Sequence, residues 1–587
     1  MKKSLMLLAI SILFKADAFA QYFPTEGAMI NYNSIVFEYQ YIKEAKEYVV
    51  QIYEEGNNET IFTQTSETTN CYINDGIIFG KRYHWNVTAK DSTGNIIFES
   101  PDMNFETLYP EYLNEDNFGI EVFTLNSEEK APGLAIIDHA SVAFDAHGKF
   151  VWFLPAITEG NKARLRDLKM TPGGTFTYIK EPFIANECDI NGNIIWNAPL
   201  EGKISGDSTE HFHHDLYKTS KGTYMVLSQK RKKKQVPDYI DPKYIKAAPG
   251  FIEEGNKFFI TITYGTLIEY DKSGKMVWHW DSENYFDDKD LFFHKDTNGI
   301  INPSSHLNAF YYDEAKEIVY VSSRDFSRII KIDKASKKIL NSYGKKMPSG
   351  ESKSGDGLFR FQHNPILTKN NLLAIFNNDS TDAENISSSI ILLEEPKKAN
   401  GEAKIKWSFS LNFDESTDGK CSRTGSVTEL PNGNLLAYMG TTGRVIEVTP
   451  QKEIVWDIEV RQYKNESDWT PFVQYRANYI PVLHPVIFSV SHQLPDTLYF
   501  KKDNSLDLTL AILNEGILKD AYQISITNDA GKIIYTPQTK LIPQYQKELI
   551  NLKFKPESAL PGYYFIEVSS IANGLKSKRI EDIYISK

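Results

Sequence analysis

Three histidines stand at equivalent places in successive repeats of the sequence, and they are the first candidates for chemistry. His214 lies in HFHHDLYK, His306 in SSHLNAFYY and His363 in FQHNPIL, each at the start of a segment that predicts a strand. If these strands line the centre of a repeated fold, the three imidazoles converge although they are far apart in the chain. Converging imidazoles can serve as nucleophile, acid or base.

A guanidinium and an amide are expected at the same end of these strands. Arg324 follows the segment VYVSS, and Asn378 holds the matching place in the next repeat. A catalytic zinc site usually adds carboxylates beside its histidines, and glycoside hydrolysis needs a carboxylate pair; neither is evident at these positions. Arg, Asn and His suit the binding of a tetrahedral oxyanion that an imidazole attacks. The set therefore favours transfer of a phosphoryl or sulfuryl group, with no metal and no cofactor.

A hairpin pattern that recurs six times must position these side chains. It consists of an apolar run, a polar turn, two apolar residues and a Trp, and five of the eight Trp residues of the chain occupy this last position. The fourth copy lacks the Trp, and the fifth has a longer turn. The copies span residues 142–152, 185–196, 267–278, 329–341, 390–407 and 445–456.

A second hairpin precedes these copies and completes a four-stranded unit. Its strands alternate apolar and polar residues around turns rich in Gly or Asn, which is typical of antiparallel strands. Six four-stranded sheets bury both faces best when they stack radially. We therefore predict an all-β chain with a six-bladed β-propeller over residues 109–484. An open β-solenoid is the alternative, which the long insertions and the lack of a strict short period disfavour.

The segments on either side of the propeller read as immunoglobulin-like or fibronectin-like β-sandwiches. Residues 21–108 and 485–587 contain alternating strands at the length scale of such a domain. A basic run, 230–234, lies in a long insertion of the third repeat. We interpret it as a solvated loop, with a patch for an anionic ligand as the alternative.

The first twenty residues resemble a secretory signal peptide. Lys2 and Lys3 precede an apolar stretch, 5–14, and Ala18-Phe19-Ala20 forms a cleavage site after Ala20. We expect a periplasmic or secreted protein without a membrane span; a buried N-terminal helix is the alternative.

Composition limits the partners and the sources of stability. The chain carries 65 Lys and Arg against 77 Asp and Glu, a net charge of −12, which argues against nucleic acid as a partner. Hydrophobic residues make up 41% of the chain and can build a large core. The three cysteines, Cys71, Cys188 and Cys421, fit neither a disulfide framework nor a Cys-based metal site.

Five short motifs give the chain a resemblance to the bacterial arylsulfotransferases. They are HHD (213–215), HLN (306–308), SSR (322–324), QH (362–363) and LPNGN (430–434), in this order, and Arg324 lies 18 positions after His306. The resemblance covers roughly residues 110–480. It implies a six-bladed propeller preceded by a β-sandwich, and transfer of a sulfuryl group from an aryl sulfate donor to a phenolic acceptor through a sulfohistidine, without a nucleotide donor. It also allows a homodimer.

The resemblance carries roles to individual residues. His363 matches the nucleophile, and His306, Arg324 and Asn308 match groups that grip the sulfuryl oxygens. His214 matches a further histidine of the site, with His213 as the alternative; Asn378, from its register with Arg324 rather than from the resemblance, is expected to contact substrate. A hydroxyl from the last blade is also expected: Ser426, or else Ser422 or Thr424.

Two other functional classes fit the same architecture. One is a non-enzymatic propeller that binds an anionic glycan or a surface partner. The other is a propeller lyase or sulfatase that acts on sulfated polysaccharide.

Overall fold

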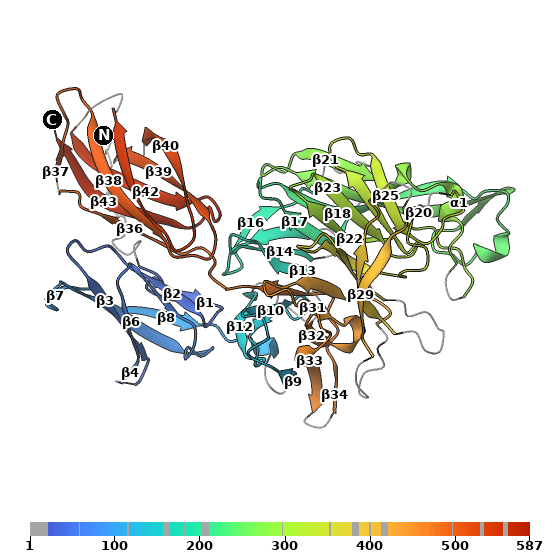
Figure 1. The fold of residues 1–587 in the computed structure, drawn as a ribbon, viewed down its shortest axis with the longest axis horizontal. Helices are drawn as coiled ribbons and strands as arrows, with labels where there is room; N and C mark the ends of the chain where they lie inside the picture. The colour runs from blue at the N-terminus through green and yellow to red at the C-terminus, as the bar shows by residue number, and fades with distance from the viewer. Residues whose placement is uncertain are drawn as a thin grey trace, which may run out of the picture. The chain divides into compact units, whose positions relative to one another are not determined.

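The computed structural model describes most of the chain between Tyr22 and Ser586 and shows an almost entirely β-stranded protein (Figure 1). The predicted signal peptide lies outside the described residues. Further undescribed positions are 58, 114–116, 156–164, 181–183, 201–210, 296–297, 351–353, 379–386, 398–400, 413–418, 420, 466–467, 496, 529–532 and 556–560.

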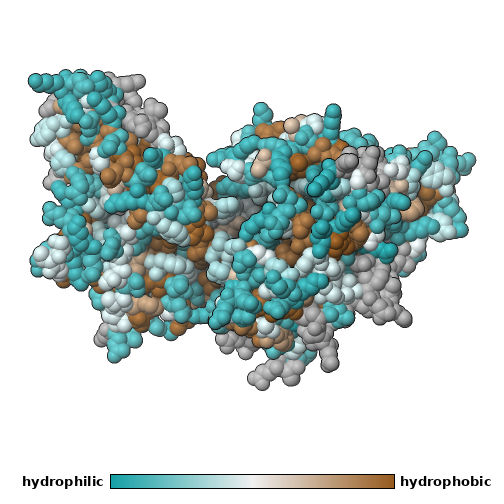
Figure 2. Space-filling model, in the orientation of Figure 1, coloured by the Kyte–Doolittle hydropathy of each residue, from teal (hydrophilic) through white to brown (hydrophobic). Residues whose placement is uncertain are grey.

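The chain divides into two compact units. The propeller unit is Pro110–Leu483, and the flanking unit combines the segment up to Tyr109 with the segment from His484 onward. Hydrophilic residues cover much of the drawn face of each unit, with apolar patches between them (Figure 2). Within the described residues no helix is long and apolar enough to cross a membrane.

The propeller unit is built from six antiparallel sheets, or blades. Blade 1 contains β10 (Leu134–Ile137), β11 (Val142–Phe144), β12 (Phe150–Phe153) and β35 (Ala477–Ile480). Blade 2 contains β13 (Leu165–Met170), β14 (Phe176–Lys180), β15 (Ile184–Cys188) and β16 (Ile194–Asn197). Blade 3 contains β17 (His211–Lys218), β18 (Tyr224–Gln235), β20 (Lys257–Tyr270) and β21 (Met276–Asp281), with β19 (Ile252–Glu254) added to β20.

The remaining blades follow the same order along the chain. Blade 4 contains β22 (Leu307–Asp313), β23 (Ile318–Ser323), β24 (Arg328–Asp333) and β25 (Ile339–Gly344). Blade 5 contains β26 (His363–Leu367), β27 (Leu373–Asn377), β28 (Ser389–Glu394) and β29 (Lys404–Ser410). Blade 6 contains β30 (Ser426–Glu429), β31 (Leu435–Tyr438), β32 (Arg444–Val448) and β33 (Ile454–Asn465), extended by β34 (Asp468–Pro471) and β9 (Phe118–Leu125).

The innermost strands of the blades form a closed ring. In order around it, β35, β13, β17, β22, β26 and β30 each contact the next, and β30 contacts β35 again. The all-β propeller class predicted from the repeats is thereby confirmed. The ring closes because β35, which follows the sixth blade in sequence, pairs with β10 of the first.

Polar side chains latch neighbouring blades at five of the six junctions, from an inner strand in four cases and from Asp138, directly after β10, in the fifth. In each latch, a short polar side chain accepts a hydrogen bond from a backbone N–H of the neighbouring blade. The bonds are Asp167 N to Asp138 Oδ2 (3.1 Å), Leu216 N to Asp167 Oδ2 (3.0 Å), Phe310 N to Asp215 Oδ2 (3.1 Å), Val427 N to Asn364 Oδ1 (2.8 Å) and Ala477 N to Ser426 Oγ (3.3 Å).

The repeated Trp makes an outer set of latches. Four of the five indoles donate their N–H to a backbone carbonyl in the turn of the following blade, and the last of these bonds joins blade 6 to blade 1. The bonds are Trp152 to Ile190 (2.7 Å), Trp278 to Lys334 (2.7 Å), Trp407 to Pro450 (2.8 Å) and Trp456 to Ala146 (2.8 Å). The fifth, Trp196, stacks on Tyr224 of the next blade with ring centroids 3.7 Å apart.

The N-terminal part of the flanking unit has two sheets. One contains β1 (Ala28–Ile30), β8 (Met103–Thr107), β6 (Arg82–Lys90), β3 (Glu47–Glu54) and β4 (Thr60–Ser66), with β7 (Ile96–Glu99) on β6; the other pairs β2 (Ile35–Glu38) with β5 (Asn70–Ile73). Phe37 of β2 packs edge-on against Trp85 of β6, with centroids 5.0 Å apart, so the sheets face each other.

The C-terminal part also has two sheets around one apolar core. One contains β36 (Phe488–His492), β38 (Leu506–Asn514) and β41 (Lys547–Phe554). The other contains β37 (Thr497–Tyr499), β43 (Ser577–Ser586), β42 (Gly562–Ser570), β39 (Asp520–Asn528) and β40 (Ile533–Ile542). Lys576 and Lys578 of this part bind Glu38 of the N-terminal part, so the two flanks form one unit rather than separate spacers.

The basic run of the third repeat is not a solvated loop. Lys230 to Lys234 lie within β18, which pairs in register with β20. The lysines of the run reach carboxylates on adjacent segments, including Asp281, Glu283 and Glu254. This neutralisation removes the basis for an anion-binding patch there.

Candidate functional site

A β-bulge at the same place in several inner strands aims the candidate side chains. The register shifts between Phe212 and Leu216 on β17, between Leu307 and Ala309 on β22, and between His363 and Ile366 on β26. Bulges re-aim side chains at functional sites. His214, within the bulge of β17, has a positive φ of 64°, and His306, directly before β22, has a positive φ of 37°.

The structure brings the three predicted histidines together around one buried tyrosine. The ring centroids of His214 and His306 are 6.0 Å apart. The ring of Tyr475 lies 5.3 Å from that of His214 and 6.2 Å from that of His363, edge-on in both cases. Residues as far apart in sequence as His214 and Tyr475, 475 − 214 = 261 positions, thus form one cluster.

The hydrogen bonds of His363 define its tautomer. Its Nδ1 lies 2.6 Å from Oδ1 of Asn378. The amide of Asn378 is oriented by its own donations, to the carbonyls of Cys421 and Thr424 (2.9 Å to Thr424), so its oxygen must face His363 as an acceptor. Nδ1 of His363 therefore carries the proton, and Nε2 carries the lone pair.

Burial keeps this imidazole neutral. His363 is 3% exposed. Burial, together with Arg324 and His306 nearby, lowers the pKa of His363 to about 3, although the hydrogen bond to Asn378 opposes the shift. A neutral imidazole with a free Nε2 lone pair is a competent nucleophile across the physiological pH range.

Arg324 and His306 are joined by a carboxylate that the sequence reading overlooked. Asp325 accepts from Nδ1 of His306 through Oδ2 and from the Arg324 guanidinium through Oδ1, both at 2.8 Å. Arg324 also donates to the carbonyl of Ser422 (3.0 Å). The expectation of a cluster without carboxylates beside the histidines is therefore wrong.

The neighbours His213 and His214 differ in their place. His214 contacts His306 and Tyr475, whereas His213 is 4% exposed and lies behind it, with the two Nδ1 atoms 2.7 Å apart. One of these nitrogens must donate and the other accept, so the two rings hold opposite tautomers. The structure thus assigns the cluster position to His214.

Asn308 connects two blades at the cluster. It is fully buried, and its Nδ2 donates to the carbonyl of Gln362 (2.7 Å), the residue before His363. The backbone carbonyl of Asn308 accepts a hydrogen bond from the hydroxyl of Tyr475 (2.8 Å). These contacts fix the strand that carries His363 beside the one that carries His306.

The sequence predicted that the hydroxyl of Ser426 joins the site, but the structure places this hydroxyl outside the histidine cluster. The hydroxyl of Ser426 donates to the carbonyl of Ala477 (3.0 Å) and accepts from its N–H, so Ser426 serves as a latch rather than as a group of the cluster. Ser422 and Thr424 adjoin the cluster through their carbonyls, which accept from Arg324 and Asn378.

Two residues of the cluster were missed from the sequence. Tyr475 lies on the short connection to β35 and carries no repeat signal. Arg166 places its guanidinium 4.9 Å from the centroid of the Tyr475 ring. A signal for Arg166 did exist, because Arg166-Asp167-Leu168 repeats the pattern of His214-Asp215-Leu216.

A buried charge network lies next to this cluster. Arg476 binds Asp167 (2.7 Å) and Asp215 (3.1 Å), and Lys169 binds the same two carboxylates. Burial and the neighbouring Asp215 raise the pKa of Asp167; burial opposes ionisation of Asp215 too, but Arg476 and Lys169 lower its pKa. Two cations and two carboxylates balance, so the network holds three blades together without excess charge.

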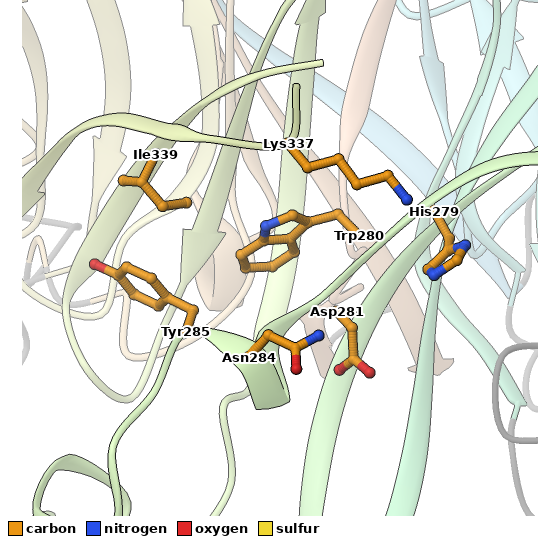
Figure 3. Close-up of a pocket in the computed structure, with 7 residues that line it drawn as sticks. All are labelled: His279, Trp280, Asp281, Asn284, Tyr285, Lys337 and Ile339. Carbon is orange, nitrogen blue, oxygen red and sulfur yellow. The ribbon is translucent and has the colours of Figure 1, made fainter. Parts of the chain in front are cut away.

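In the described part of the chain the histidines of the cluster form no metal-binding group, and a cavity of the propeller unit lies away from them. Among the described residues no group of three or more His, Cys, Asp or Glu could hold a metal ion. A cavity of about 200 Å³ lies between the outer strands β21 and β25, with Trp280, Tyr285 and Lys337 on its walls (Figure 3). None of the candidate site residues lines it.

Solved structures resemble parts of the chain at low identity. One is a protein of unknown function from Bacteroides caccae, 12% identical, covering 60% of this chain and 99% of that chain, with a TM-score of 0.36. Another is a catalytically inactive virginiamycin B lyase from Staphylococcus aureus with quinupristin, 10% identical, covering 59% and 88%, with a TM-score of 0.28. No curated protein sequence matches the chain.

Family models give the decisive match. A model described as Arylsulfotransferase (ASST) matches residues 184–461, and a second model with the same description matches residues 121–243. Together they span more than half of the chain and include every residue of the histidine cluster except Tyr475. The chain belongs to the arylsulfotransferase family.

Proposed function

We propose that this protein is an exported arylsulfotransferase that moves a sulfuryl group from an aryl sulfate to a phenol through a sulfohistidine at His363. The family match supports an arylsulfotransferase activity in general. The observation that carries the covalent mechanism is the pair formed by His363 and Asn378, which leaves the lone pair on Nε2 of a neutral, buried imidazole.

In the first half-reaction, Nε2 of His363 attacks sulfur. The N–S bond forms, the bond between sulfur and the aryl oxygen breaks, and the electron pair leaves with that oxygen. The ring gains positive charge while Nδ1 continues to donate to Asn378. Arg324, with Arg166 nearby, supplies fixed positive charge for the sulfuryl oxygens.

In the second half-reaction, an acceptor phenol reverses these steps. Its oxygen attacks sulfur, its proton passes to a base of the site, and the N–S electron pair returns to Nε2. The kinetics expected from this sequence are ping-pong.

Export rests on residues 1–20, whose pattern is that of a secretory signal peptide. N-terminal sequencing of the protein from a culture fraction tests it. The mature chain should begin at Gln21, and an intact Met1 on the exported protein would contradict the proposal.

A two-substrate assay tests the activity itself. Release of 4-nitrophenol from 4-nitrophenyl sulfate should depend on an added phenol, which becomes the sulfate ester. A brief exposure to donor alone should leave an adduct of about 80 Da, the mass of SO₃, on the peptide that contains His363. Repeated turnover without an acceptor, beyond one equivalent of 4-nitrophenol per site, would indicate a sulfatase, and the absence of any adduct would indicate transfer without a covalent step.

A further inference from the structure

Asp325 is the carboxylate of the cluster that the proposed reaction has not yet used. It directly follows Arg324 and contacts both of that reaction's candidate cations, His306 and Arg324, at 2.8 Å each. Its side chain is 20% exposed. It accepts hydrogen bonds through both oxygens, so it must be ionised to serve both partners.

The two histidines that flank the reacting sulfur differ in what holds their Nδ1. His363 has an amide oxygen there, from Asn378, whereas His306 has a carboxylate. A carboxylate stabilises an imidazolium, and a neutral amide does so far less. They also differ in access, because the side chain of His306 is 34% exposed and His363 is 3% exposed.

The surroundings agree with this division. The charged and titratable groups near His306 are Asp325, Arg324, His213, His214 and His363. Asp325 is the one group of this set that carries a negative charge. Burial opposes its ionisation, but His306 and Arg324 outweigh burial and lower the pKa of Asp325.

We propose that Asp325 is the positioning residue that makes His306 the proton donor and acceptor of sulfuryl transfer, and that the site therefore accepts aryl sulfates of weakly acidic phenols. This inference rests on the proposed function. Nδ1 of His306 keeps its proton and donates it in a hydrogen bond to Asp325, so Nε2 is the nitrogen that exchanges protons with substrate.

The proton balance closes over both half-reactions. As the bond between sulfur and the aryl oxygen breaks, the proton on Nε2 of the His306 imidazolium passes to the leaving oxygen, and a phenol departs. His306 is then neutral, with a lone pair on Nε2. In the second half-reaction the acceptor phenol returns a proton to Nε2 as its oxygen attacks sulfur.

Proton donation by His306 matters most for donors whose leaving phenol is weakly acidic. A nitrophenolate leaves without help, because its charge is delocalised, whereas an unsubstituted phenolate needs a proton as it leaves. General acid catalysis contributes typically about 10²–10⁴-fold where it is needed. The protein should therefore use phenyl sulfate, and Asp325 should matter for that donor above all.

The test compares Asp325→Asn with wild type on two donors, phenyl sulfate and 4-nitrophenyl sulfate, with one acceptor phenol in excess. We expect kcat/KM for phenyl sulfate to fall about 100-fold and kcat/KM for 4-nitrophenyl sulfate to fall less than about 10-fold, because kcat/KM for the donor in a ping-pong scheme reports the first half-reaction alone. His306→Gln should show the same selective loss, and the double variant should lose little more, because the two residues act as one unit.

Three controls separate the outcomes. Arg324→Gln, which removes a sulfuryl-binding group, should lower turnover of both donors alike, and Asp333→Asn, at the end of β24, should change neither. Adduct formation at His363 from 4-nitrophenyl sulfate should persist in Asp325→Asn, which shows that the variant folds. An equal fall on both donors would overturn the inference, whereas a wild-type protein inactive on both would overturn the proposed function instead.

Discussion

The inner and outer strands of the propeller use the same sixfold repeat in opposite ways. On the outer strands one residue type is kept: Trp152, Trp278, Trp407 and Trp456 each donate to the next blade. On the inner strands the side chain before the latch changes from blade to blade. Arg166 precedes Asp167, His214 precedes Asp215, and His363 precedes Asn364.

The difference shows how a repeat can hold both structure and chemistry. The latch residue keeps the neighbouring blade in place, so the residue before it can change without loss of the ring. The outer position has no such partner, because the Trp is itself the latch. Substitutions at the two kinds of position should therefore separate activity from stability.

The largest effect is expected at the inner position of blade 5. His363→Ala should lower phenol-dependent turnover by at least about 10³-fold, because the proposed nucleophile is lost. The unfolding midpoint should change little, since Asn364 still latches Val427. Turnover and urea unfolding of the same preparation check both statements, and normal turnover would contradict the covalent mechanism.

Breaking the buried charge network around Arg476 should lower the stability of the propeller. Arg476→Met leaves two buried carboxylates with one lysine, which is expected to lower the free energy of unfolding by about 3–5 kcal/mol. Urea unfolding measures it. Arg423→Met, at an exposed arginine of the same unit, is the matched control. Equal stability of the two variants would show that the network is not a structural element.

Acid should weaken the inner ring in a defined window. Burial lowers the pKa of His213 and of His363 to about 3, below the roughly 6.5 of an unfolded histidine. Between these values the unfolded chain binds protons that the native chain does not, so the free energy of unfolding falls as pH falls.

Substitution of one of these histidines tests the window. His363→Gln should lose less stability than wild type between about pH 7 and about pH 4.5, because one of the proton-linked groups is gone. Thermal unfolding at both pH values measures the difference. An identical loss in the two proteins would mean that His363 is not held neutral.

The smallest effect is expected at a single outer latch. Trp456→Phe keeps an aromatic ring but removes the N–H that bonds Ala146, and should cost about 1 kcal/mol of unfolding free energy. Trp196→Phe occupies the same slot, but the indole nitrogen of Trp196 has no partner among the described residues. It is the matched control and should cost less; the reverse order would contradict the latch.

The fold was largely predictable because its signals are local and repeated. Alternating strands, turns and the recurring Trp lie within short windows of sequence, and six copies average out the weak ones. The candidate cluster was predictable where a residue begins a repeat, as with His214, His306 and His363. The role of Ser426 was not predictable, because a residue at the start of an inner strand can either link two blades or belong to the site. Only the hydrogen-bond partner of the Ser426 hydroxyl distinguishes the two roles.

The sequence by itself determined the class of fold, the number of hairpin repeats and the residue types that can attack and hold a sulfuryl group. Tertiary structure decided which groups meet: β35 closes the first blade, and Tyr475 packs between His214 and His363. The physical reason is distance along the chain. A repeat states its own hydrogen-bonding pattern, but contacts between residues more than a hundred positions apart arise only when the ring closes.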